Sequence, residues 1–378
     1  PLTAAQRPTG RLKQCPLLTG RVLVGRAGHR SLIMGYKYTI GVLGAGAWGT
    51  ALAEHLAGAC GHAVLLWSFE KKTARDISKK LENTLFLPGV KLSQNIEVTT
   101  NDKELVQNCE MVIFASPSAH CASMAVRLAP LLTADQVLII SSKGLREDDG
   151  GLLSDVWMEA NPSFKNIAVL SGPTFAGELA GHKPLTATLA GENEALIKRI
   201  DQVFSSRRLR LYYSDDIIGA QVGGAVKNAI AIAAGISDGL EMGEGFKVAL
   251  LCRGIVEMMR YSKHLGGSTL TLAGLSGMGD LTMTATAGSR NYRFGYALGQ
   301  GKSVEEAKND VGSTIEGIGT AGILTQQGVS RGIDMGVIMA VHGVVNGDLG
   351  AKRTFELLST RPRVYEFESD ITLGESIE

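Results

Sequence analysis

The chain has 378 residues, 44% of them hydrophobic and 20% charged, a composition that fits a globular protein with room for two domains. A net charge of +1 provides no broad cationic surface for nucleic acid, and no apolar run approaches the roughly 18 to 20 residues of a membrane span, so neither partner is expected. The five cysteines form no CxxC pair and no ligand cluster with the seven histidines, which predicts reduced thiols and no structural metal.

Residues 1–37 form a basic segment with seven Lys or Arg residues and no acid, since the first acidic residue of the chain is Glu54. With scattered Ser and Thr, this composition is typical of an organelle transit peptide. A disordered basic tail is the alternative, because the apolar residues show no clear period. Because neither interpretation makes it part of the folded core, we exclude the segment from the fold prediction. We expect an intracellular protein, cytoplasmic or, if the segment is a transit peptide, organellar.

From residue 38 to 214, short aliphatic runs alternate with helix-like stretches. Runs such as YTIGVL, HAVLLW, MVIFAS and NIAVLSG are separated by stretches such as TALAEHLAGACG and EALIKRIDQVF. Continuous apolar strands separated by helices predict a parallel sheet that is covered on both faces. The predicted class is α/β, with an N-terminal Rossmann-type, doubly wound, mostly parallel sheet that binds a dinucleotide.

After residue 214 the strand signal stops, and residues 215–362 are predicted to form an all-helical, substrate-binding domain. Asp215 and Asp216 precede the long apolar stretch IIGAQVGGAVKNAIAIAAGI and suit the N-terminus of a helix, whose dipole favours negative charge. Residues 363–378 are predicted to be a solvated acidic tail.

The sequence GAGAWG at 44–49 matches the GxGxxG pattern of dinucleotide-binding turns. It directly follows the apolar run TIGVL and opens the helix TALAEHLA, so backbone amides and the helix dipole would face a pyrophosphate. The predicted cofactor-binding residues of this turn are Gly44, Gly46, Ala47, Trp48 and Gly49.

The end of the second predicted strand bears on the choice of cofactor. Glu70 lies three residues after the strand and is followed by Lys71 and Lys72. A carboxylate at this place favours NAD through the ribose hydroxyls, whereas a cation favours NADP. We predict NAD through Glu70 and leave NADP open; the alternative is that the three charges only begin a solvated helix.

Four polar stretches occur where loops should leave strand ends or interrupt helices: SSKG at 141–144, SGPTFAGE at 171–178, KN at 227–228, and MGDLTMTATAGSRNYRFG at 278–295. Because the carboxyl ends of parallel strands line one crevice, the first two stretches should place Lys143 and Thr174 close together. The four stretches are therefore expected to converge on one ligand.

With these motifs the chain resembles the NAD(P)-dependent sn-glycerol-3-phosphate dehydrogenases in their bacterial-type form. The resemblance covers residues 38 to 360 and rests on GAGAWGTALA, SKG, SGPTFAGE, VKN, GDL with SRNYRFG, and IEGIGTA, in that order. It implies reversible hydride transfer between NAD(P)H and dihydroxyacetone phosphate, giving sn-glycerol 3-phosphate, and it implies a homodimer.

The resemblance also assigns roles to single residues. Lys227 becomes the proton-transferring residue. Positions that match the family's substrate-lining residues are Lys143, Gly172, Thr174, Asp280, Ser289, Arg290 and Asn291, and those that match residues near the cofactor are Lys143, Ala176, Arg290 and Glu316.

The chemistry of these residue types agrees with the assignment. Ketone reduction needs a cation or acid at the oxygen where negative charge develops, and Lys227 can supply it. Burial among small residues should lower the pKa of Lys227, while a nearby Asp280 should raise it. Arg290 can donate two hydrogen bonds to phosphate oxygens, and the Asn291 amide can donate a third.

Each of these residues also has a purely structural interpretation. Lys227 could extend its ammonium to water, and Asp280 could cap the helix that follows. Surface charges would account for Arg290 and Glu316, and loop conformation alone for Lys143 and Thr174. Alternative functions are a β-hydroxyacid or ketopantoate-type reductase, and a non-catalytic NAD(H)-sensing protein. The phosphate-suited SRN sequence disfavours the first, and the retained Lys227 and Asp280 disfavour the second.

Overall fold

The computed structural model describes residues 39–204, 206–312, 314–362 and 365–366. The predicted transit peptide and nearly all of the predicted acidic tail lie outside the described residues. The four cysteines within the described part, Cys60, Cys109, Cys121 and Cys252, are unpaired.

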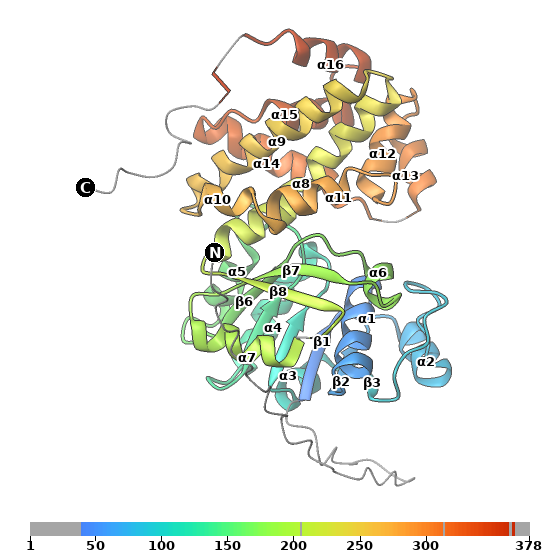
Figure 1. Ribbon diagram of the computed structural model, residues 1–378, viewed down its shortest axis with the longest axis vertical. Helices are drawn as coiled ribbons and strands as arrows, with labels where there is room; N and C mark the ends of the chain where they lie inside the picture. Colours follow the sequence, from blue (N-terminus) through green and yellow to red (C-terminus); the bar gives the residue numbers. More distant parts are fainter. Residues whose placement is uncertain (1–38, 205, 313, 363–364, 367–378) are drawn as a thin grey trace, which may run out of the picture. The chain divides into compact units, whose positions relative to one another are not determined.

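The first half of the chain forms one eight-stranded sheet (Figure 1). Its strands, in the spatial order β3-β2-β1-β4-β5-β6-β7-β8, are β1 (Thr39–Leu43), β2 (Ala63–Trp67), β3 (Ile96–Thr99), β4 (Met111–Phe114), β5 (Val137–Ile140), β6 (Ile167–Ser171), β7 (Leu185–Ala190) and β8 (Leu209–Ser214). All neighbouring strands pair in parallel except β6 and β7, which pair antiparallel. The predicted Rossmann-type, mostly parallel sheet is confirmed.

Both faces of the sheet are buried, as the continuous apolar strands predict. Ile40 and Val42 of β1 pack in one core with Ala51 and Leu52, whereas Leu43 packs in a second core on the opposite face. The first core is closed by α1 (Ala47–Glu54), α6 (Ala176–Ala180) and α7 (Glu194–Phe204), and the second by α3 (Asp102–Asn108), α4 (Cys121–Leu128) and α5 (Leu153–Ala160). The alternation follows the two-residue period of a strand.

Several elements differ from the sequence prediction. The predicted helix after the glycine-rich turn is divided, since α1 is followed by a π-helical turn, η1 (His55–Ala59). Strand β3 and helix α3 were not predicted, because β3 has only four residues and carries the exposed Glu97 at the sheet edge. The remaining elements of this half are α2 (Lys71–Lys80) and the short 3-10 turns η2 (Ser118–His120) and η3 (Ala129–Leu131).

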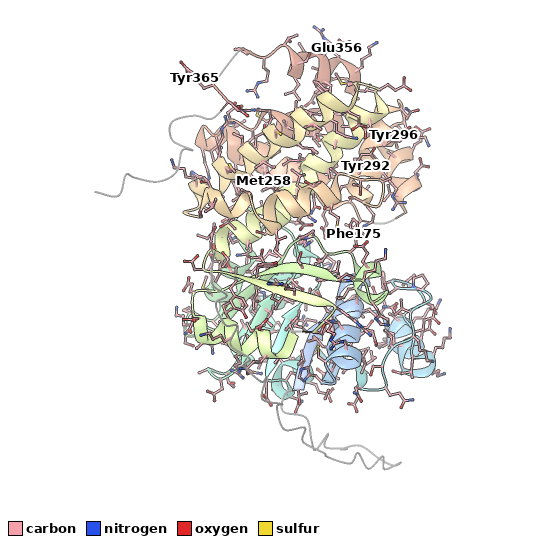
Figure 2. All side chains as sticks on the ribbon, in the orientation of Figure 1. Phe175, Met258, Tyr292, Tyr296, Glu356 and Tyr365 are labelled. Carbon is pink, nitrogen blue, oxygen red and sulfur yellow. The ribbon has the colours of Figure 1, made fainter. Side chains whose placement is uncertain are left out.

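The second half is helical throughout its described residues 217–359, as predicted (Figure 1). It comprises α8 (Ile217–Gly239), α9 (Glu244–His264), α10 (Thr269–Leu272), the π-helical turn η4 (Leu275–Gly279), α11 (Asp280–Thr284), α12 (Arg290–Gly299), α13 (Val304–Val311), α14 (Glu316–Arg331), α15 (Gly336–Asn346) and α16 (Ala351–Ser359). Its apolar side chains form a third core, to which Met258 of α9 belongs (Figure 2). The chain contacts group Tyr38–Glu378 into one compact unit, so the division into domains 38–214 and 215–362 stays a prediction.

Helix α8 is the central element of this half, and it corrects one expectation from the sequence. The helix is long and apolar enough by length and composition to cross a membrane, because Lys227 and Asp238 are its only charged residues. However, 89% of its most apolar window is buried inside the protein, as in the core helix of a globular fold. A Cβ at Gly235 would overlap the carbonyl oxygen of Tyr292, so the small residues of α8 serve close packing against α12.

The N-terminus of α8 is capped by Asp216. Its Oδ1 accepts a hydrogen bond from the amide of Gly219 at 2.8 Å, and its Oδ2 accepts one from the amide of Ser268 at 3.1 Å. The cap therefore fixes both the start of α8 and the segment before α10. Asp215 is exposed, and no side-chain cap bond involves it.

Replacing Asp216 with Ala should lower the free energy of unfolding by about 1 to 2 kcal/mol, because two backbone amides lose their acceptor. Urea unfolding of Asp216→Ala, Asp216→Asn and Asp215→Ala measures this. We expect Asn to retain most of the stability, and Asp215→Ala to match the wild type. Equal losses in the two alanine variants would contradict the assignment of the cap.

Candidate active site

The glycine-rich turn joins β1 to α1 as predicted. Gly44 has φ +128°, and a Cβ there would lie 2.8 Å from the Ala115 carbonyl oxygen, while a Cβ at Gly49 would overlap the Gly44 carbonyl oxygen. At Gly46, in contrast, an added Cβ would meet open space. The turn therefore uses two glycines for packing and leaves the backbone at Gly46, the N-cap of α1, open to a ligand. Ala47 and Trp48 are partly buried at the start of α1.

The segment after β2 leaves Glu70 exposed. Ser68 is fully buried, and its hydroxyl donates to the Glu70 carbonyl oxygen at 3.1 Å. Glu70 is the N-cap residue of α2, but its carboxylate forms no capping bond. Phe69, Lys71 and Lys72 are exposed beside it. A carboxylate and two ammonium groups are therefore available at this end of β2, and the preference for NAD through Glu70 stays a prediction.

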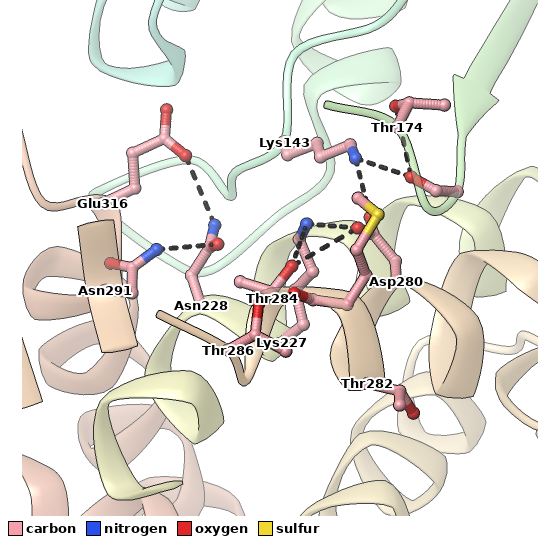
Figure 3. Close-up of polar contacts among 12 residues, drawn as sticks. Lys143, Thr174, Lys227, Asn228, Asp280, Thr282, Thr284, Thr286, Asn291 and Glu316 are labelled. Carbon is pink, nitrogen blue, oxygen red and sulfur yellow. Dashed lines mark hydrogen bonds and ion pairs between the residues drawn. The ribbon is translucent and has the colours of Figure 1, made fainter. Parts of the chain in front are cut away.

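Two lysines converge on one buried carboxylate (Figure 3). Asp280 is fully buried; its Oδ1 accepts a hydrogen bond from the Lys227 ammonium, and its Oδ2 accepts one from the Lys143 ammonium at 2.7 Å. Lys143 also donates to the Gly172 carbonyl oxygen at 2.9 Å, and Lys227 donates to the Thr284 hydroxyl at 2.8 Å. Both strand-end stretches and both helical stretches thus meet at one place, as expected from the sequence.

The backbone around Asp280 explains how this cluster is built. The π-helical turn η4 ends at Gly279, and Asp280 begins α11. A Cβ at Gly223 would overlap the carbonyl oxygen of Ser276, so η4 lies directly against α8 at this glycine. The close approach brings the carboxylate of Asp280 within hydrogen-bonding reach of Lys227, which lies one turn further along α8.

Burial determines the protonation of Lys227. Its exposed fraction is 5%, and desolvation lowers its pKa to about 8, against the opposing attraction of Asp280, which raises the pKa. The charge of Lys143 lowers the pKa further. The result is an amine that changes its charge near neutral pH while it is held by a carboxylate and a hydroxyl.

A second polar group lies one residue along α8. The Asn291 amide donates to the Asn228 side-chain oxygen at 3.0 Å, and the Asn228 amide donates to Glu316 at 3.3 Å (Figure 3). The Asn291 oxygen accepts a hydrogen bond from the Gly317 amide at 3.0 Å. Asn291, predicted to face a phosphate, therefore also links α8, α12 and the start of α14.

The remaining predicted residues surround these two groups. The Thr174 hydroxyl donates to the Gly172 carbonyl oxygen at 3.3 Å, and Ala176 begins α6. Ser289 is buried as the N-cap residue of α12, whereas Arg290, the first residue of that helix, is exposed. Burial raises the pKa of Glu316, and the charge of Arg290 is the largest influence that opposes this shift. Phe175 lies beside the loop at Gly288 and ties the strand end after β6 to the helices (Figure 2).

Sequence reasoning missed two residues of the site. Thr284 was not singled out because its hydroxyl reaches Lys227 only through the one-turn spacing from Asp280 on α11. Asn228 belongs to the KN pair, to which the sequence assigns no role beyond that of Lys227; the signal that could have identified Asn228 is a polar side chain inside an apolar helix.

Two neighbouring glycines of α8 face other parts of the protein. Gly223 accommodates the backbone of η4, and a Cβ at Gly224 would lie 2.9 Å from the Ser171 hydroxyl and 3.4 Å from the Lys143 side chain. The missing side chains thus let the protein's own groups approach α8.

The chain matches two models of one protein family along most of its length. Residues 39–197 match the N-terminal model, and residues 216–356 the C-terminal model, of NAD-dependent glycerol-3-phosphate dehydrogenase.

Individual relatives agree with the family match. The chain is 40% identical over 332 residues to a glycerol-3-phosphate dehydrogenase [NAD(P)+] of Erythrobacter litoralis. The aligned residues cover 88% of this chain and 98% of that protein. It is 39% identical to the enzyme of the same description from Rhodospirillum rubrum, over 85% of this chain and 92% of that protein. The crystal structure of a glycerol-3-phosphate dehydrogenase from Coxiella burnetii superposes with a TM-score of 0.82 at 34% identity, over 86% of this chain and all of that chain.

The geometry of the lysine pair predicts a titration that NMR can measure. The Lys227 amine should lose its proton at about pH 8, and Asp280→Asn should move this transition to lower pH, because the carboxylate is the main group that raises the pKa. Since the folded-state pKa lies below the 10.5 of a free lysine, the contribution of Lys227 to stability should increase as the pH rises from about 8 to 10.5.

Lysine ε-carbon signals recorded against pH, with Lys227 assigned by substitution, test this expectation. Lys247 serves as an internal reference, because its hydrogen bond to Glu244 raises its pKa above the usual lysine value, whereas the pKa of Lys227 is lowered. A Lys227 transition that stays unchanged in Asp280→Asn would contradict the electrostatic account.

Proposed function

The chain belongs to the NAD-dependent glycerol-3-phosphate dehydrogenase family, and on this basis we propose that it catalyses reversible hydride transfer between NAD(P)H and dihydroxyacetone phosphate, giving sn-glycerol 3-phosphate. The observation that carries the proposal is the buried Lys227, held by Asp280 beside a second ammonium group. A sensing protein would have no use for a buried amine with a pKa of about 8. A β-hydroxyacid or ketopantoate-type reductase binds a carboxylate, whereas the stretch Ser289-Arg290-Asn291 suits a phosphate group and therefore favours the phosphorylated substrate.

The cofactor would lie on the glycine-rich turn, where the open backbone at Gly46 and the N-terminus of α1 suit a pyrophosphate. When bound, it supplies the hydride. We assign the adenine ribose to Glu70 and therefore propose NAD as the preferred cofactor, with Lys71 and Lys72 as the residues that would favour NADP.

Lys227 supplies the proton. During reduction the hydride adds to the carbonyl carbon, and the Lys227 ammonium donates its proton to the carbonyl oxygen, which becomes the new hydroxyl group. In the reverse direction the neutral amine accepts that proton. A pKa of about 8 leaves both forms populated near neutral pH, so one residue can serve both directions.

Lys143 and Asp280 control the charge around this proton. The Lys143 ammonium, fixed by Asp280 and the Gly172 carbonyl group, adds a second cation where negative charge develops on the oxygen. Asp280 neutralises one of the two ammonium groups, since two unpaired buried cations would be prohibitively costly. Thr284 orients the Lys227 amine.

The phosphate group would be bound by Arg290, whose exposed guanidinium can donate two parallel hydrogen bonds to its oxygens. Asn291 fits beside it, because its amide nitrogen keeps a second hydrogen after bonding Asn228. Ser289 and Thr174 complete the proposed substrate contacts.

The cell compartment and the assembly are also proposals. Similarity to bacterial enzymes favours the cytoplasm, and the comparisons give the transit-peptide prediction no support. A homodimer remains the expectation from the family.

The decisive experiment follows NADH and NADPH absorbance with dihydroxyacetone phosphate, and with unphosphorylated dihydroxyacetone as the control ketone. We expect oxidation with the phosphate ester, a much lower kcat/KM with the control, and a preference for NADH. Absence of turnover with dihydroxyacetone phosphate would refute the proposed activity.

The Lys227→Ala variant separates an enzyme from a binding protein. It should bind NADH like the wild type while kcat falls by about two to four orders of magnitude, the usual contribution of a general acid. Wild-type turnover in this variant would show that Lys227 is only a structural residue.

Arg290→Ala should raise the KM for dihydroxyacetone phosphate by about tenfold to a hundredfold, since a charge-assisted bond to phosphate is lost. Its effect on the unphosphorylated ketone should be small. Arg293, which is also exposed and lies one turn along α12, provides the matched control variant Arg293→Ala. Equal KM values in the two variants would remove Arg290 from the phosphate site.

A further inference from the structure

A line of serine hydroxyls connects the glycine-rich turn to the loop that carries Lys143. The buried Ser116 hydroxyl donates to the carbonyl oxygen of Leu43, the last residue before the turn, at 2.9 Å. The Ser142 hydroxyl donates to the Ser116 carbonyl oxygen at 2.5 Å and has a longer contact of 3.2 Å to the Phe114 carbonyl oxygen. Ser142 directly precedes Lys143 in the chain.

The same segment is packed tightly on both sides. A Cβ at Gly44 would lie 2.9 Å from the Ser116 amide nitrogen, and a Cβ at Gly144 would overlap the Ser118 hydroxyl. The segment Ala115–Ser118 is therefore packed closely against the cofactor turn at Gly44 and against the Lys143 loop at Gly144.

The Lys143 loop depends on this connection. The last sheet-type hydrogen bond of the strand is that of the Ser141 amide to the Phe114 carbonyl oxygen. Within the described residues, the amides of residues 142–145 donate to no backbone carbonyl group. Beyond the sheet, the hydrogen bond of the Ser142 hydroxyl is thus the first one that fixes the loop. The ammonium group of Lys143 is held by Asp280 and Gly172.

We propose that Ser142, through Ser116, is a positioning residue that couples occupancy of the cofactor turn to the placement of the Lys143 ammonium. The path runs from Leu43 through the two serines to Lys143 and ends on the carboxylate shared with Lys227. Cofactor bound at the glycine-rich turn holds Ser116 and Ser142 in place, and with them the Lys143 ammonium. The phosphorylated substrate then binds to a site whose charges are already positioned. Thermodynamic reciprocity requires that substrate then tightens cofactor binding by the same factor. This inference rests on the proposed function.

The coupling can be measured without turnover, because NADH and sn-glycerol 3-phosphate are both reduced and cannot react with each other. The dissociation constant of NADH is measured by fluorescence with and without saturating sn-glycerol 3-phosphate. For the wild type we expect binding to tighten about fivefold or more, the lower range of measured couplings. In Ser142→Ala the ratio should fall by about threefold or more, to a value close to one, as expected for one lost hydrogen bond. NADH binding alone should change less than about twofold, since no cofactor contact is removed.

Three further variants separate coupling from general weakening of the fold. Ser116→Ala breaks the same path at its other serine and should also abolish the coupling. Ser142→Thr keeps the hydroxyl and should restore it. Ser141→Ala removes a neighbouring buried hydroxyl that bonds only the Phe114 carbonyl oxygen at 3.1 Å, so the coupling should persist.

Two outcomes would overturn the inference while leaving the proposed function intact. One is a wild type that turns over dihydroxyacetone phosphate but shows no coupling between NADH and sn-glycerol 3-phosphate. The other is a Ser142→Ala variant with the same coupling as Ser141→Ala. If the wild type neither binds sn-glycerol 3-phosphate nor oxidises NADH with dihydroxyacetone phosphate, the proposed function fails, and this inference fails with it.

Discussion

The structure of this protein is organised around a carboxylate that it cannot leave unpaired. Asp280 is fully buried, and two ammonium groups from distant parts of the chain neutralise it. A lone carboxylate at this depth would be protonated or would destabilise the fold by several kcal/mol. Formation of the ion pairs therefore requires that the loop after β5, helix α8 and the turn η4 assemble together. The electrostatic constraint joins the sheet half to the helical half.

The composition of α8 follows from this requirement. A helix that carries a buried ammonium group must lie close to the segment that carries the counter-ion. This close approach requires small side chains where the helix contacts the backbone of other segments. Gly223 admits η4, and Gly235 admits α12. Glycine inside a helix costs roughly 1 kcal/mol relative to alanine, so the helix gives up intrinsic stability for this packing. The burial of most residues of α8, with aliphatic side chains such as Ile230 and Ile236 in the third core, compensates for this loss.

Much of this arrangement was predictable from the sequence, because the strong signals are periodic or local. Apolar runs identify the strands, and the carboxyl ends of parallel strands must gather Lys143 and Thr174 at one crevice. The glycine-rich turn was recognised by its position between a strand and a helix. Asp216 could be predicted as a cap from its residue type, but the sequence could not choose between it and Asp215.

The unpredicted features depend on tertiary geometry. The apolar residues of a strand do not show its direction, so the antiparallel pairing of β7 with β6 could not be predicted. The four residues of β3 are too few to show an alternation of apolar and polar side chains. Thr284 reaches Lys227 only because η4 sets the rotation of α11. The packing role of Gly223 depends on which backbone lies opposite, and no spacing along α8 specifies that neighbour.

The pKa of Lys227 shows how these levels combine. Desolvation lowers the pKa of the amine, whereas the negative charge of Asp280 raises it. A pKa of about 8 requires both the burial of Lys227 in α8 and the carboxylate of Asp280, which follows η4. Under the proposed function, a phosphate dianion bound by Arg290 adds negative charge to the site and raises the pKa of Lys227. Substrate binding would then favour the ammonium form, the one that reduction consumes.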